Sequence, residues 1–130
     1  MRRSAPLALL ALSLMLTGCG PDVEKNAEYA NAWQVRQALL EAGHDCPGEH
    51  QVDHGTDAED IEFTLKCDSD LSLETVTDEY AEGLEGKIAT LHALTKLPNT
   101  LHGPNWVITS KDMDRLVAIQ ENLGGKITAG

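Results

Sequence analysis

Two short alternating runs on either side of a tight turn constrain the fold more than any other feature of this chain. Residues 61–67 alternate apolar and polar side chains, which is typical of a strand with one buried face. The polar stretch 68–70 is a turn, and residues 71–76 alternate again, less regularly. The two runs predict a β-hairpin whose apolar face must be covered by other elements.

Three other segments have the apolar spacing of helices, and one more has that of a strand. Apolar residues recur every three or four positions in 24–42, in 78–97 and in 112–123, while 106–109 is a short apolar strand. Gly83 and Gly86 predict a kink or a split in the second helix. The order α-β-β-α-β-α predicts an α+β two-layer sandwich, in which helices cover one face of a small mixed three-stranded sheet.

The first nineteen residues have the layout of an export signal. Arg2 and Arg3 precede an apolar run, 6–16, that is too short to cross a membrane, since a spanning helix needs about 20 residues. The run ends in residues 16–19, LTGC, which resembles the lipobox of a bacterial lipoprotein signal peptide. The resemblance implies cleavage before Cys19 and a diacylglyceryl anchor on its thiol, at the extracytoplasmic face of the cell membrane. The alternative is a plain secretory peptide with Cys19 as an ordinary thiol.

This interpretation divides the chain into four parts: a cleaved signal peptide, 1–18; a lipidated tether, 19–26; a single extracytoplasmic α+β domain, 27–125; and a loose tail, 126–130. With Cys19 lipidated, Cys46 and Cys67 remain as an even pair. Outside the cytoplasm such a pair is most simply one disulfide, so we expect Cys46 and Cys67 to be bonded.

The charge of the chain excludes one class of partner. The formal net charge is −11, and the only charged side chains before Cys19 are Arg2 and Arg3, so the remainder is more acidic still. Such a surface repels nucleic acid and anionic lipid headgroups. We therefore expect no nucleic-acid binding, and a membrane attachment that depends on lipid.

The polar loop 44–57 is a candidate ligand site, because a loop this long in a small domain is either functional or disordered. Two cysteines and two histidines of this region have ligand types that bind Zn²⁺, but their spacing lacks a Cys knuckle and a disulfide would remove both thiolates. A weaker set combines histidines with Asp53 or Asp57, and the alternative is a solvated loop. The histidine candidates are His44, His50 and His54.

Arg36 and Trp106 are candidate contacts for an unknown ligand. Arg36 falls within the apolar face of the first helix, where it either anchors an anion or extends its stem along the core. Trp106 opens the last strand beside a Gly-Pro turn, where it either stacks on a ligand or belongs to the core.

No sequence motif indicates catalysis, a cofactor or a phosphate-binding loop. The sequence therefore favours a non-catalytic binding or interaction module with an envelope protein as partner. The alternative is a metal- or small-ligand-binding lipoprotein that uses the loop 44–57. A small enzyme is disfavoured, because no arrangement of nucleophile and base is visible.

The C-terminal half carries a second resemblance. Residues 103–108, GPNWVI, and 119–125, IQENLGG, look like parts of small actinobacterial-type secreted proteins and lipoproteins, which also carry an earlier cysteine pair. The resemblance implies a shared domain type, and it transfers no activity and no functional residue.

Overall fold

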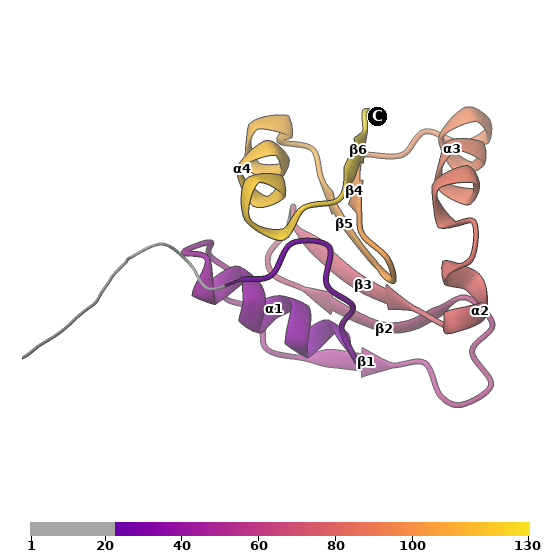
Figure 1. The fold of residues 1–130 in the computed structure, drawn as a ribbon, viewed down its shortest axis with the longest axis horizontal. Coiled ribbons are helices and arrows are strands. Elements are labelled where there is room, and N and C mark those ends of the chain that lie inside the picture. Colours follow the sequence, from indigo (N-terminus) through magenta and orange to yellow (C-terminus); the bar gives the residue numbers. More distant parts are fainter. Residues whose placement is uncertain (1–22) are drawn as a thin grey trace, which may run out of the picture.

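One antiparallel sheet with helices on both sides forms the part of the chain that the computed structural model describes, residues 23–130 (Figure 1). The helices are α1 (Ala32–Glu41), α2 (Asp78–Ala81), α3 (Leu84–Leu94) and α4 (Met113–Leu123), and the strands are β1 (Gln51–Asp53), β2 (Ile61–Lys66), β3 (Ser72–Val76), β4 (Asn99–His102), β5 (Trp106–Ser110) and β6 (Lys126–Thr128). The six strands lie in the order β1-β2-β3-β5-β4-β6, and every neighbouring pair is antiparallel.

The prediction of a small mixed three-stranded sheet is wrong. Three further strands, β1, β4 and β6, come from segments interpreted as a polar loop, the connection between a helix that ends at Pro98 and the turn after it, and a loose tail. Each has three or four residues, too few for alternation to show. Each is held by backbone pairing to a neighbouring strand, and this pairing depends little on the identity of the side chains.

The predicted hairpin is confirmed as β2 and β3. Leu65 pairs with Leu73 in register, so both apolar side chains point to the same side of the sheet. A register shift between Ile61 and Phe63 turns Ile61 to the opposite side, where it borders Val76.

Local features explain where the first predicted helix begins and where the second is divided. The first helix begins at Ala32, later than predicted, because the Asn31 side chain accepts a hydrogen bond from the Gln34 backbone N–H at 2.9 Å. The second is divided into α2 and α3 at Gly83, whose φ of 71° is left-handed and interrupts the helix.

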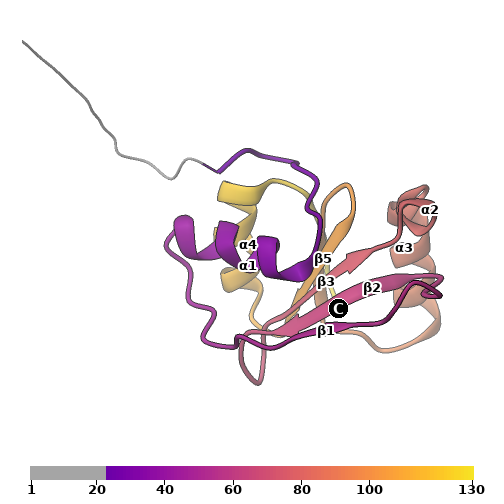
Figure 2. The ribbon, with the colours of Figure 1, turned by 90° about the horizontal axis from the view of Figure 1, so that it is seen from below.

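Helices cover both faces of the sheet, which corrects the prediction of a two-layer sandwich. Figures 1 and 2 show α1 and α4 on one side of the strands and α2 and α3 on the other. The α1/α4 face holds the larger core, centred on Trp106, Ile108 and Leu73. The α2/α3 face holds a much smaller cluster of four buried residues, Val76, Leu84, Ile88 and Val107.

The predicted disulfide between Cys46 and Cys67 is confirmed, and it lies within the larger core. It joins the segment after α1 to the end of β2. A polar network ties the turn of the hairpin to α4 nearby. Arg115 on α4 contacts a carboxylate oxygen of Asp68 at 2.8 Å and one of Asp70 at 3.3 Å.

Candidate functional site

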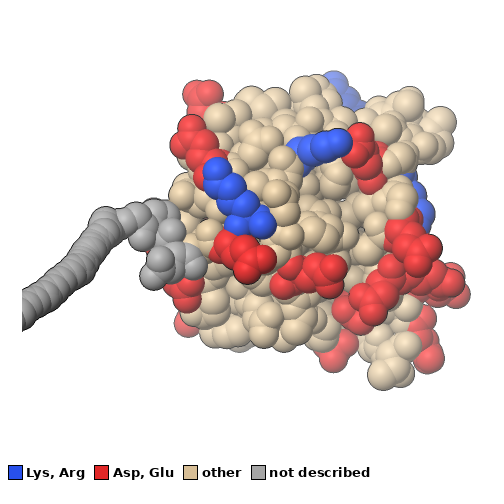
Figure 3. All heavy atoms as spheres, viewed as in Figure 1, with Lys and Arg blue, Asp and Glu red and all other residues tan. Residues whose placement is uncertain are grey.

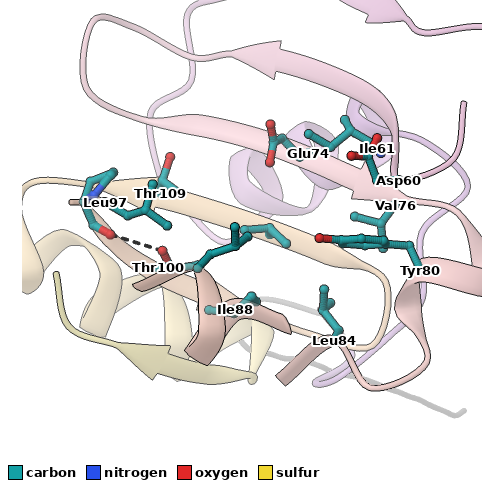
Figure 4. Close-up of a pocket in the computed structure, with 13 residues that line it drawn as sticks. Asp60, Ile61, Glu74, Val76, Tyr80, Leu84, Ile88, Leu97, Thr100 and Thr109 are labelled. Carbon is teal, nitrogen blue, oxygen red and sulfur yellow. Dashed lines mark hydrogen bonds between the residues drawn. The ribbon is translucent and has the colours of Figure 1, made fainter. Parts of the chain in front are cut away.

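A cavity of about 410 Å³ lies between the sheet and the α2–α3 pair, on the face with the smaller core. Its volume lies within the range of small-molecule sites. Strands β3, β4 and β5 form its floor, α2 and α3 form its roof, and residues on either side close its ends (Figure 4). The lining residues are Asp60, Ile61, Glu74, Val76, Tyr80, Leu84, Ile88, Leu91, Leu97, Pro98, Thr100, Val107 and Thr109.

The apolar walls follow from the periods of the two kinds of element. On α3, Leu84, Ile88 and Leu91 recur at intervals of four and three residues and so share one helix face. On β5, Val107 and Thr109 point to this side of the sheet, because residues two apart in a strand share a face. The helix is short and its facing side chains do not fill the space above the strands, so a cavity remains.

The polar side chains of the cavity are few, and all of them end in oxygen atoms. The Tyr80 ring extends from α2 toward the middle of the cavity, with its hydroxyl foremost, while Glu74 and Asp60 lie along one side (Figure 4). The Thr100 hydroxyl is already engaged, since it donates to the Pro98 carbonyl at 3.1 Å. No serine, cysteine, histidine, lysine or arginine is among the residues that line the cavity.

Glu74 is the most perturbed group of the cavity. Burial raises the pKa of its carboxyl above the ordinary value, and the charge of Asp60 adds to the rise, while His54 opposes it. Among residues 23–130 no hydrogen bond holds this carboxylate. The side chain is therefore a partly desolvated acid without a fixed partner, on the wall of an apolar cavity.

The histidines predicted as metal ligands have separate surroundings. The His44 ring contacts the Asn122 side chain at 2.8 Å, and the His54 ring contacts the Thr64 hydroxyl at 2.9 Å, while His50 is exposed. Within the described residues, no group of three or more His, Cys, Asp or Glu side chains is placed to hold a metal ion.

The two other predicted ligand contacts are engaged within the protein. Arg36 is buried, and its Nε donates to the carbonyls of Cys46 and Gly48 at 3.1 and 2.7 Å. Its guanidinium carbon lies 4.8 Å from the centre of the Trp33 ring. Trp106 is fully buried, and its Nε1 donates to the Ala27 carbonyl at 2.9 Å.

Cys19 and the signal segment lie outside residues 23–130, so the structure places neither. No helix of the described part is long and apolar enough to cross a membrane.

Sequence reasoning did not select any residue of the cavity as a site. One signal for it was present: the apolar Val76 lies on the same side of the strand as Ser72 and Glu74, opposite Leu71 and Leu73. That signal has no meaning until it is known which elements cover the second face of β3.

Comparison of the chain with known protein families, with curated proteins and with solved structures finds no match.

Proposed function

We propose that this chain is a lipid-anchored, extracytoplasmic, non-catalytic binding protein whose domain takes up a small, largely apolar molecule between α3 and the sheet. The observation that carries the proposal is the cavity of about 410 Å³, which has apolar walls and a few polar groups along one side. We therefore favour this cavity, rather than the loop 44–57, as the ligand site.

The packing of the two faces supports this choice. The α1/α4 face buries fifteen residues, including Trp106. The α2/α3 face buries four, and Leu91, which lines the cavity, is 43% exposed at its edge. A face that is folded but incompletely filled offers room and an entrance for a ligand.

A binding function without catalysis is supported by the kinds of residue present. The polar side chains of the cavity are two carboxylates, a phenol and two threonines. Covalent catalysis requires a nucleophile that is activated by a base within hydrogen-bond reach, and histidine, the commonest such base, does not line the site. The acidic surface continues to disfavour nucleic acid as a partner.

Blocking the cavity tests the proposal. The full chain is incorporated into lipid nanodiscs, and binding of n-octanol is measured by titration calorimetry against empty nanodiscs. We expect saturable binding, and we expect Leu91→Trp to reduce the affinity at least tenfold by filling the entrance. Leu94→Trp is the matched control, because Leu94 is on the same helix but is 75% exposed and lies outside the cavity. Equal binding by both variants would remove the cavity as the site.

The anchor is tested separately. Cys19→Ser is expected to abolish the added lipid mass of the mature protein and to release it from the membrane fraction. The double variant Cys46→Ser, Cys67→Ser is the control, and it should keep both properties. Persistence of the lipid in Cys19→Ser would contradict the anchor at this position.

A further inference from the structure

We infer that the ligand of this cavity is a cationic amphiphile, an apolar molecule with an ammonium or similarly charged end that faces Glu74 and Asp60. The inference rests on the proposed function and adds the chemical class of the ligand. It follows from where charged side chains lie within and around an apolar cavity lined by thirteen residues.

The charges that line the cavity have one sign. Glu74 and Asp60 both border it, and neither lysine nor arginine does. The two carboxylates are close enough for Asp60 to disfavour ionisation of Glu74. A cation placed between them would relieve this repulsion, whereas an anion would increase it.

Glu74 also has the placement that a cation site requires. It points from β3 to the same side of the sheet as Val76, and its carboxylate lies along the cavity wall next to Ile61 (Figure 4). Burial disfavours its charge, and a bound cation would offset this cost while Glu74 stays ionised. A charge-assisted contact to a ligand ammonium supplies such a partner.

The surface near the α2 side of the cavity is acidic as well. Asp78, Glu79 and Glu82 are exposed on or directly after α2, and Figure 3 shows carboxylates gathered over that end of the molecule. Charges of one sign around an entrance raise the local concentration of oppositely charged ligands. The approach and the interior therefore favour the same class of molecule.

The nearby basic groups do not line the cavity, although the charge of His54 lowers the pKa of Glu74 more than that of Asp60 raises it. Lys87 Nζ is held by the carbonyls of Tyr80 and Glu82 at 2.9 and 2.8 Å, and it lies over the Tyr80 ring. His54 faces Glu74 across the sheet surface, but its ring contacts Thr64 and is exposed. Neither lines the cavity, so neither takes the position of a ligand cation.

Three probes of equal chain length test the inference. Binding of n-octylammonium, n-octanol and octanoate to the full chain in nanodiscs is measured at pH 7 against empty nanodiscs. We expect octylammonium to bind about tenfold more tightly than octanol, since a hydrogen bond to a charged group contributes about that much. We expect octanoate to bind most weakly.

The variant Glu74→Gln then assigns the preference to one residue. It should lose most of the tenfold preference for octylammonium while keeping its affinity for octanol, which shows that the cavity is intact. Glu121→Gln is the matched control, because it removes one charge from the exposed surface of α4, on the other side of the sheet.

The outcomes distinguish the inference from the proposed function. If octanol binds in a way that Leu91→Trp blocks, but octylammonium shows no advantage or Glu74→Gln changes nothing, the inference is overturned and the binding function stands. If octanoate binds best, the ligand class is wrong. If none of the three probes binds saturably, the proposed function fails as well.

Discussion

The two faces of the sheet differ in how completely they are packed, and under the proposed function one face would serve stability and the other binding. Toward α1 and α4 the strands present Trp106, Ile108 and Leu73, all fully buried, and the disulfide closes the same core. Toward α2 and α3 the same strands present Val107, Thr109 and other smaller or polar side chains beside a cavity. Because successive strand residues point to opposite faces, one strand can serve both purposes.

This difference in packing indicates that a protein tolerates incomplete packing on one face of a sheet when the other face is well packed. Domain stability is a small difference between large terms, so a second, poorly filled layer requires a strong first one. We therefore expect the α1/α4 face to supply most of the free energy of unfolding, which would leave the α2/α3 face free for the proposed binding.

Removal of the Trp106 side chain should produce the largest loss in the free energy of unfolding. Trp106→Ala deletes a fully buried ring and its hydrogen bond to Ala27, so we expect the free energy of unfolding to fall by about 3–5 kcal/mol. Val107→Ala, one residue along on the other face, should cost only about 1–2 kcal/mol. Urea unfolding followed by far-ultraviolet circular dichroism measures both, and equal losses would contradict the comparison.

Loss of the disulfide should have the next largest effect on the free energy of unfolding. Replacing Cys46 and Cys67 by Ala, which removes a link between residues 21 apart in sequence, should lower the free energy of unfolding by about 2–4 kcal/mol. Because the bond lies on the α1/α4 face, the affinity for octanol should remain within about twofold of the wild type at low urea. Urea titration and calorimetry check the two parts, and a parallel loss of affinity would show that the faces are coupled.

The carboxylates at the hairpin turn should make the α1/α4 side sensitive to acid. Arg115 and backbone N–H groups hold the pKa of Asp68 well below its ordinary value of 3.8, and Ser110 and Lys111 lower that of Asp70. Groups whose pKa is lowered by folding stabilise the protein above the ordinary value and lose this contribution as the pH falls below it. We expect Asp68→Asn to cost about 1–2 kcal/mol at pH 7 and much less at pH 2.

Urea unfolding of the wild type and of Asp68→Asn between pH 7 and pH 2 measures this dependence. Asp114→Asn, in the exposed first turn of α4, serves as the control for loss of a carboxylate without the Arg115 contact. A constant difference between the wild type and Asp68→Asn across the pH range would contradict the assigned role of Arg115.

Substitution of Glu74 should change the free energy of unfolding least, and it should increase it rather than lower it. Its pKa is raised by folding, so ionised Glu74 destabilises the folded state, and this cost disappears as the pH falls through the raised pKa toward the ordinary 4.5. We expect Glu74→Gln to increase the free energy of unfolding by about 0.5 kcal/mol at pH 7. The gain should vanish below pH 4. A loss of stability at pH 7 would mean that Glu74 has a stabilising partner.

Sequence reasoning succeeded where a signal is local. Alternation gave β2 and β3, helical spacing gave α1, α3 and α4 to within a few residues at most ends, and Gly83 marked the division between α2 and α3. It failed at β1, β4 and β6, which are too short to carry a pattern, and β6 also pairs with a strand far from it in the chain. It also extended the first helix back to residue 24, although residues 27–31 bond elsewhere, Tyr29 to Asn105 for example.

The candidate site was less predictable than the fold. The loop 44–57 was predicted as a candidate ligand site because histidines and carboxylates cluster there in sequence. The cavity instead brings together Glu74, Tyr80 and Leu91, which meet only through the crossover from β3 through α2 and α3 to β4.

The sequence alone determined the hairpin, the helical faces, the even pair of cysteines and the acidic character of the surface, because each depends on neighbouring residues or on composition. Only the tertiary structure decided that β1, β4 and β6 complete the sheet, that helices cover both faces and that Glu74 borders a cavity. These features arise from contacts between segments far apart in the chain, and such contacts leave no pattern in the local sequence.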